Sequence, residues 1–118
     1  MKQTISLLRQ GFESSSGTTP EFLAFYRTFK RELTKALTER GCTKIEIGKG
    51  HFYCSGFFTS PSGQIYYISL PDVRGFSEGD SCNGSMMYRT AKHYKDWTGG
   101  SNQWVKFEPD MISKMRIL

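Results

Sequence analysis

The hydrophobic pattern of the chain changes its period at Gly41, and this change most constrains how the chain can fold. Before Gly41, apolar residues recur at every third or fourth position, which is typical of an amphipathic helix. The recurring residues are Phe22, Tyr26, Phe29, Leu33 and Leu37. Pro20 suits the first turn of such a helix and Gly41 suits a left-handed C-cap, so the sequence predicts a helix over residues 19–40.

A second, shorter helix is predicted over residues 2–13. Its apolar side would carry Ile5, Leu8 and Phe12. Residues 13–20, with the sequence ESSSGTTP, are the low-complexity stretch of the chain and predict a turn between the two helices. Thr18 or Thr19 can cap the longer helix through a side-chain oxygen.

After Gly41, apolar and polar residues alternate, which is the period of a β-strand. The segments that predict strands are TKIEIGKG, HFYCSGFFTS, QIYYISL, SMMYRTA and QWVKF. The PSG between the second and third segments predicts a hairpin turn, and the turn formers of residues 73–84 predict a loop. Residues 110–118, with the sequence DMISKMRIL, predict a short final helix.

Helices followed by a run of strands predict an α+β fold. We expect two N-terminal helices packed on one face of an antiparallel sheet of about five strands, and a short C-terminal helix. A chain of 118 residues suits one domain with one hydrophobic core.

The formal net charge is +5 and the pI is about 9.2. This balance favours an acidic partner such as nucleic acid. No apolar run approaches the roughly 18 residues of a membrane span, and the first residues are too polar for a secretory signal. We therefore expect a cytoplasmic protein that does not bind membranes.

The cysteines Cys42, Cys54 and Cys82 are widely spaced and odd in number. Such a pattern argues against a disulfide framework and against a zinc site, because no Cys-x-x-Cys pair occurs. We expect buried free thiols, and we expect neither a metal site nor a cofactor.

The polar side of the 19–40 helix is one candidate binding surface. At about 100° per residue, Arg27, Arg31 and Lys35 fall opposite the apolar side. These cations could bind phosphates, or they could form a solvated face, as runs of charge usually do.

Aromatic residues are expected on both faces of the sheet. In the second strand, one face would carry Tyr53, Ser55 and Phe57, and the other Phe52, Cys54 and Phe58. Two helices cover only one face well. Either the second face is open, with rings that can stack unpaired bases or anchor a protein, or it is closed by the C-terminal residues Met111, Ile112, Met115, Ile117 and Leu118.

Residues 88–102, with the sequence YRTAKHYKDWTGGSN, are the second candidate binding surface. They combine basic and aromatic residues, namely Arg89, Lys92, His93 and Lys95 with Tyr88, Tyr94 and Trp97. Gly99 and Gly100 are not followed by the Lys-Ser/Thr of a P-loop, so we interpret them as residues that permit positive φ at a turn. The segment is predicted to be a hairpin loop, either with a recognition tip or as a plain connector.

The enzyme hypotheses lack groups that converge on one site. Residues 79–84, GDSCNG, resemble the Gly-Asp-Ser-Gly turn of trypsin-like proteases, but Cys82 replaces a glycine and the chain is too short for that fold. A small hydrolase that pairs Cys54 or Cys82 with His51 or His93 is an alternative. Cys54 and His51 are nevertheless expected on opposite faces of one strand.

Two longer segments, GFFTSPSGQIYYISLPDVRG and YRTAKHYKDWTGGSNQWV, are similar to small uncharacterised proteins of bacterial phages and conjugative elements. The resemblance covers about the C-terminal half of the chain. It implies a compact accessory protein of a mobile element. Such proteins often bind nucleic acid or block a host defence complex, and anti-CRISPR inhibitors are among them.

The sequence therefore predicts a small non-enzymatic binding protein with an acidic partner, either nucleic acid or a host protein complex that binds nucleic acid. The candidate binding residues are Arg27, Arg31, Lys35, Arg89, Lys92, His93, Lys95 and Trp97. The alternatives are an anti-CRISPR-like inhibitor that acts by protein–protein contact and a small cysteine–histidine hydrolase.

Overall fold

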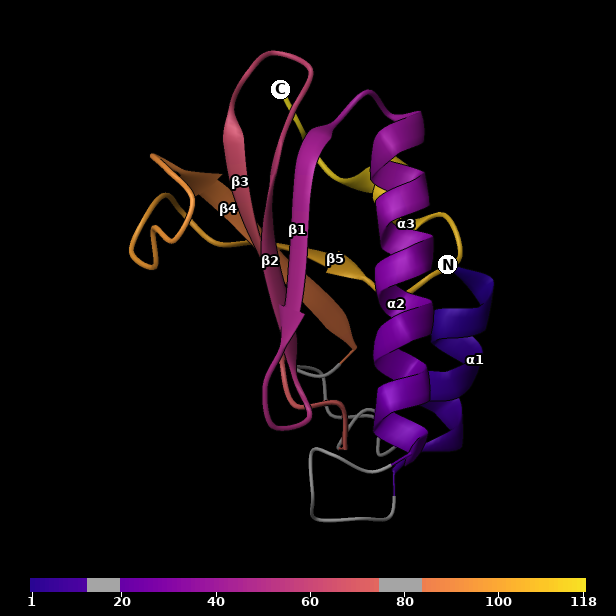
Figure 1. The fold of residues 1–118 in the computed structure, drawn as a ribbon. Coiled ribbons are helices and arrows are strands. Elements are labelled where there is room, and N and C mark those ends of the chain that lie inside the picture. Colours follow the sequence, from indigo (N-terminus) through magenta and orange to yellow (C-terminus); the bar gives the residue numbers. More distant parts are fainter. Residues whose placement is uncertain (13–19, 75–83) are drawn as a thin grey trace.

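The computed structural model of the chain describes residues 1–12, 20–74 and 84–118 (Figure 1). The elements in chain order are α1 (Lys2–Gln10), α2 (Pro20–Glu39), β1 (Thr43–Lys49), β2 (Cys54–Thr59), β3 (Ile65–Leu70), β4 (Ser85–Ala91), β5 (Gln103–Lys106) and α3 (Met111–Lys114). Some expectations lie outside the described residues, namely the Thr18 or Thr19 cap, most of the 13–20 turn and of the 73–84 loop, and the GDSCNG segment with Cys82.

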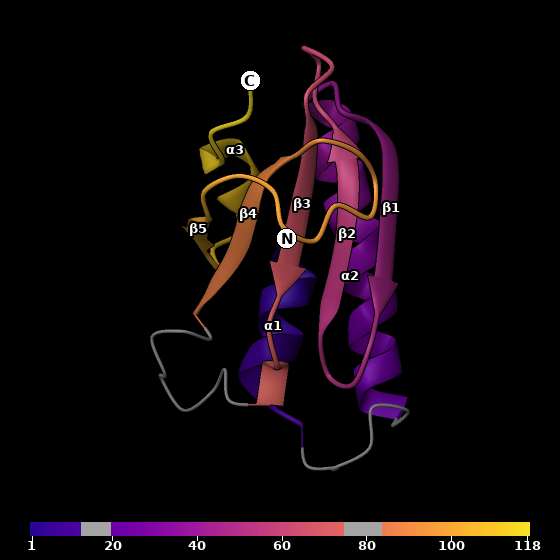
Figure 2. The same cartoon turned by 90° about the vertical axis from the view of Figure 1, so that its left-hand side faces the viewer.

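The five strands form one antiparallel sheet in the order β1-β2-β3-β4-β5, so each strand pairs with its neighbours in the sequence. Figures 1 and 2 show α1, α2 and α3 on the same face of this sheet. The predicted α+β fold is confirmed, with two N-terminal helices, five strands and a short C-terminal helix. We call the face that carries the helices the inner face and the opposite one the outer face.

The long helix α2 spans Pro20–Glu39, within the predicted range 19–40, and buries the predicted side except for Tyr26, which is partly buried. Its buried residues are Phe22, Phe25, Phe29, Leu33 and Leu37. At its end, Gly41 has a φ of 91° and donates its N–H to the Thr38 carbonyl at 2.9 Å. The N–H of Cys42 donates to the Leu37 carbonyl at 3.0 Å. These two hydrogen bonds form a Schellman motif, which confirms the predicted left-handed C-cap.

The main core lies between the helices and the inner face, and phenylalanine rings dominate it. Phe12 stands edge-on to Phe22 and Phe25, with ring centroids 6.1 and 5.6 Å apart, and Phe22 lies 5.1 Å from Phe52. The strands contribute alternate residues, among them Cys54, Phe58, Tyr66, Ile68, Leu70, Met86, Tyr88 and Val105. At about 1.5–3 kcal/mol for each fully buried large apolar side chain, this core dominates the stability.

The C-terminal segment also packs on the inner face. Its buried residues are Met111, Ile112 and Met115, all members of the main core. The N–H of Arg116 donates to the Tyr88 hydroxyl at 2.9 Å, and the N–H of Leu118 donates to the Tyr66 hydroxyl at 3.2 Å. The alternative in which the C-terminal residues close the second face of the sheet is therefore wrong, because they extend the helical layer instead.

Glu32 of α2 fixes the start of α1. Its carboxylate accepts hydrogen bonds from the Thr4 hydroxyl at 2.6 Å and the Thr4 N–H at 2.7 Å, and it lies 3.9 Å from the Met1 amine. Partial burial raises the pKa of Glu32, but these hydrogen bonds and the N-terminal charge outweigh burial, so its pKa is lowered. The two helices are thus joined by a charged contact as well as by apolar packing. None of the described helices is long and apolar enough to cross a membrane.

Candidate functional site on the outer face of the sheet

The outer face carries a row of large side chains that crosses four strands. Strand register places Glu46, Phe57, Tyr67 and Arg89 side by side, one each from β1, β2, β3 and β4. Paired residues of antiparallel strands share a face, so all four point away from the helices. The Phe57 and Tyr67 ring centroids are 5.1 Å apart. Apolar rings on this face require a cover, because they would otherwise lie in water.

The cover is the loop of residues 92–102, which joins β4 to β5 and folds back across the outer face (Figure 2). The ring of Trp97 lies 5.4 Å from that of Phe57 and 5.7 Å from that of Tyr67, edge-on to both. The ring of Tyr94 lies 5.6 Å from that of Phe57. The loop therefore builds a second, small aromatic cluster on the side of the sheet that the helices leave free.

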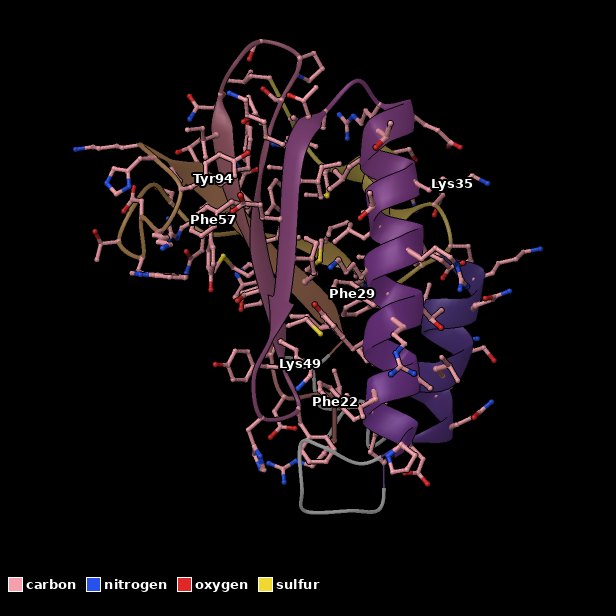
Figure 3. All side chains as sticks on the ribbon, in the orientation of Figure 1. Phe22, Phe29, Lys35, Lys49, Phe57 and Tyr94 are labelled. Atoms are coloured by element: carbon pink, nitrogen blue, oxygen red, sulfur yellow. The ribbon has the colours of Figure 1, made fainter. Side chains whose placement is uncertain are left out.

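The hydroxyl of Tyr94 fastens the far end of the loop to the edge of the sheet. It donates to the Lys44 carbonyl of β1 and lies 2.9 Å from the Thr59 hydroxyl of β2. Figure 3 shows Tyr94 beside Phe57 on the outer side of the strands. Contacts of this kind join residues about 35 to 50 positions apart in the sequence. The loop is thus packed against the sheet and does not extend from it.

Asp96 organises the interior of the loop. Its two carboxylate oxygens accept the N–H of Lys92 at 2.9 Å and the N–H of Thr98 at 3.0 Å. These hydrogen bonds to the charged form lower the pKa of Asp96. The residue is buried although it is acidic, and its bonds explain how the loop tolerates it.

Arg89 is a structural residue, contrary to the expectation that it is an exposed binding cation. Its side chain is only 4% exposed. One guanidinium nitrogen donates to the Asp96 carbonyl at 2.9 Å, and the guanidinium lies 4.6 Å above the Tyr67 ring. Arg89 therefore ties the loop to β4, because Arg can bond a carbonyl and stack on a ring at the same time.

Gly99 and Gly100 allow a close approach of two chain segments, and their interpretation as positive-φ residues is wrong. In this loop the positive φ, 71°, belongs to Lys95. A Cβ at Gly99 would lie 2.7 Å from the Thr90 carbonyl oxygen, and one at Gly100 would lie 2.3 Å from the Thr90 hydroxyl. Only residues without a Cβ let the returning chain lie this close to β4.

The remaining predicted residues of the loop lie at the surface. Trp97 is 62% exposed despite its contacts with two rings. The side chains of Lys92, His93 and Lys95 are also exposed, and His93 Nδ1 lies 2.9 Å from the Tyr94 carbonyl oxygen. The loop therefore presents a large ring and three basic groups to solvent, while its buried residues hold it on the sheet.

Trp104 of β5 is a second exposed ring on the outer face, and it is not among the binding residues predicted from the sequence. It is 55% exposed and pairs with Met87 of β4. Lys106, two residues further along β5, points to the same face and is exposed. The signal was present in the sequence, because the apolar residues Val105 and Phe107 belong in the core and therefore place Trp104 and Lys106 outside.

A strip of sheet lies between the two tryptophans. Its floor is formed by Met87, Ser69 and Ser55, which strand register places in line across β4, β3 and β2. Neighbouring strands are about 4.8 Å apart, so β5 with Trp104 lies about 10 Å from β3. Figure 2 shows the loop crossing β3 and β4 on its way to β5, and no described element lies over the strands below that crossing. We call Trp97, Trp104 and this floor the tryptophan strip.

The cations of α2 lie on the opposite side of the molecule. Arg27, Arg31 and Lys35 are exposed, and Arg31 donates to the Gln3 side chain of α1. Figure 3 shows Lys35 pointing away from the sheet, on the far side from Phe57. The two predicted groups of binding residues therefore form two separate surfaces, with the helices and the sheet between them.

The thiols of Cys54 and Cys42 are free and buried in the main core, which confirms the expectation for the two cysteines that the structure describes. Burial raises the pKa of Cys54 to about 12, so it is a neutral thiol at physiological pH. His51 is exposed, and its ring stands edge-on to that of Phe52. His93 lies on the outer side of the sheet, away from Cys54. These positions do not bring Cys54 together with a histidine in an accessible site.

Neither a metal centre in the described residues nor a comparison with known proteins identifies the protein's chemistry. In the described ranges, no group of three or more His, Cys, Asp and Glu residues could hold a metal ion. Comparisons with protein-family models, with curated proteins and with solved structures found no match. Function therefore has to be inferred from the chemistry of the outer face.

Proposed function

We propose that the protein is a non-enzymatic binding protein that recognises single-stranded nucleic acid through the outer face of its sheet. The observation that carries this proposal is the tryptophan strip. Trp97 and Trp104 are more than half exposed, lie on the same face, and are the two tryptophans of the chain. Two large exposed rings on one face supply the kind of apolar and aromatic surface that interaction sites use.

The strip offers the two interactions on which binding of single strands depends. Exposed indole rings can stack unpaired bases, and each stacked base contributes about 1–3 kcal/mol. Lys92, Lys95 and Lys106 can contact the phosphates that flank such bases, and the net charge of +5 favours the encounter. About 10 Å separates β3, which lies under Trp97, from β5, which carries Trp104. This distance leaves room for a single strand of nucleic acid to lie on the floor between the two rings.

Single strands are favoured over duplexes because a duplex hides the faces of its bases. The rings of the strip stand on a sheet, and the described part of the outer face has no helix that could enter a groove. The cationic surface of α2 is not included in the proposed site. Arg27, Arg31 and Lys35 could attract phosphates, but the ring beside them, Tyr26, is partly buried and its hydroxyl donates to the Ile47 carbonyl.

A titration of labelled oligonucleotides tests the proposal. Single-stranded and duplex DNA and RNA of matched length are titrated with protein at about 50 and about 200 mM salt. We expect the single strands to bind more tightly than the duplexes. With three phosphate contacts, affinity for a single strand should fall roughly twentyfold between the two salt concentrations. Binding should also quench tryptophan fluorescence, because the bases stack on the indoles.

Trp97→Ala and Trp104→Ala separate stacking from charge, because neither changes the net charge. Each should weaken binding of single strands by about tenfold or more. Leu118→Ala is the control, since it removes an exposed apolar side chain from the inner side of the sheet without changing the charge. Absence of binding at micromolar protein, or affinity indifferent to salt, would rule out nucleic acid as the partner. Capture of a stoichiometric host protein complex that needs Trp97 would then favour the alternative of a protein inhibitor.

A further inference from the structure

An open pocket of about 490 Å³ lies beside the free edge of β5. It is bounded by Trp104 and Lys106 of β5, and by Glu108, Lys114 and Arg116 of the C-terminal segment, with the Tyr88 side chain between them. Its size is in the range of pockets that hold small ligands. Trp104 belongs both to this pocket and to the tryptophan strip, so the two sites meet at the free edge of β5, with the C-terminal segment on the inner side of the sheet.

The pocket has an uncompensated positive charge. Lys114 forms an ion pair with Glu108 and lies 3.5 Å from the Asp110 carboxylate, so within this segment one cation faces two carboxylates and one negative charge remains. The two further cations of the pocket, Lys106 and Arg116, outweigh that charge. Lys106 and Arg116 form no ion pair with any described carboxylate. A pocket with two free cations attracts an anion, and a guanidinium next to an ammonium suits phosphate.

The free edge of β5 adds backbone donors to these cations. The N–H of Phe107 donates to the Gly84 carbonyl at 3.0 Å, toward β4. In an antiparallel ladder, alternate residues direct their backbone groups to opposite sides, so Trp104 and Lys106 direct theirs to the edge. Backbone N–H groups beside a cation are the kind of donors that bind phosphate oxygens in proteins.

We propose that this pocket binds a nucleotide phosphate, with the attached base stacked on Trp104. Lys106 and Arg116 would neutralise the phosphate, and the indole would hold the base. The inference deepens the proposed function and rests on it in one respect, namely that the ligand is a nucleotide of a bound strand. It assigns a role to Arg116, which the tryptophan strip does not include.

Mononucleotides test the pocket without an oligonucleotide. In the Trp97→Phe variant, Trp104 is the one remaining tryptophan, so its fluorescence reports on the pocket. Thymidine 5′-monophosphate, thymidine and inorganic phosphate are titrated separately against this variant. We expect the monophosphate to bind about tenfold or more tightly than the nucleoside, because it alone can use both the cations and the ring. Inorganic phosphate should compete with it.

Lys106→Gln together with Arg116→Gln, in the same background, should reduce the preference for the monophosphate to less than about twofold. Lys2→Gln together with Lys30→Gln is the matched control, because it removes the same charge from exposed helical positions. Circular dichroism checks that each variant folds. Equal affinity for thymidine and its monophosphate, or a preference that survives the Lys106 and Arg116 changes, would overturn the inference.

The outcomes for the pocket and for the proposed function are separable. If the monophosphate binds as expected but oligonucleotides do not, the phosphate pocket stands and the protein is not a single-strand binder. The opposite outcome is that oligonucleotides bind, that Trp97→Ala weakens their binding, and that the Lys106 and Arg116 changes leave it unaltered. In that case the single-strand site stands and the pocket assignment is wrong.

Discussion

The two faces of the sheet are covered in different ways. Three helices cover the inner face, and the core between them holds fully buried rings and aliphatic side chains. One loop without regular structure covers part of the outer face, and its largest ring, Trp97, is still 62% exposed. The inner face is therefore the source of stability, while the outer face has rings in reach of a partner.

The attachments of the two covers also differ. The helices are held mainly by a large apolar area removed from water, which is costly to expose. The loop is held on the sheet by a few directed contacts, chiefly those of the Arg89 guanidinium and the Tyr94 hydroxyl, and by the contacts of Trp97 with two rings. A segment held in this way can open at lower free energy than the whole domain, which suits a surface that adjusts to a ligand.

Adjacent phenylalanines on opposite faces give the largest expected difference. Phe58→Ala removes a fully buried ring from the inner core and should lower the free energy of unfolding by about 3–5 kcal/mol. Phe57→Ala should cost about half as much, because the exposed loop can close over the smaller side chain. Denaturant unfolding followed by circular dichroism measures both. Equal losses would mean that the outer cluster is as rigid a core as the inner one.

A methyl group added at Gly99 tests how closely the loop packs on β4. Gly99→Ala should cost about 1–3 kcal/mol, because the backbone carbonyl of Thr90 lies 2.7 Å from the new Cβ and cannot move away freely. Gly48→Ala is the matched control, since no atom lies within 4 Å of its Cβ position. The loss of stability should be accompanied by a red shift of Trp97 emission. The shift is measured in a Trp104→Phe background, where Trp97 is the one tryptophan. Unchanged stability and emission would contradict the close approach.

Acid should loosen the loop through Asp96, with a smaller effect. Since the hydrogen bonds lower the folded-state pKa of Asp96, its contribution is fully present above the ordinary Asp value and is lost as pH falls through the lowered one. We expect Trp97 emission to shift below about pH 4 in the chain with Asp96, and Asp96→Asn to abolish that part of the shift. Glu32 and Asp72 also have lowered pKa values, so Asp96 is assessed from the difference in emission shift between the unaltered chain and the Asp96→Asn variant. The same pH dependence of Trp97 emission in both chains would show that the Asp96 carboxylate does not hold the loop in place.

The sequence predicted the elements of the inner face because their signals are local. The helical period of α2 and its Gly41 cap lie within one segment, and a sheet of sequential hairpins needs only neighbouring pairings. The alternation in β5 also predicts that Trp104 faces away from the core, once Val105 is recognised as a core residue.

The outer face could not be predicted in the same way, because its arrangement depends on distant contacts. Tyr94 reaches Lys44, and nothing in residues 88–102 indicates which strand the loop will touch. Arg89 can be buried because its guanidinium donates to a loop carbonyl and lies over a neighbouring ring. Neither contact can be recognised from the sequence of the strand that contains the arginine. Gly99 and Gly100 were interpreted from their freedom in φ, whereas their role comes from the atoms beside them.

The most direct test of the account compares the two cationic surfaces in one binding assay. Lys92→Gln with Lys95→Gln removes two charges from the outer side, and Arg27→Gln with Lys35→Gln removes two from α2. Fluorescence anisotropy with a labelled single strand, over a range of salt, gives the affinity and its salt dependence. We expect the outer pair to weaken binding about tenfold and to reduce the slope of log K against log salt by about 1.4, and the α2 pair to change affinity less than twofold. An equal or larger loss from the α2 pair would show that the binding surface lies on the helix and not on the sheet.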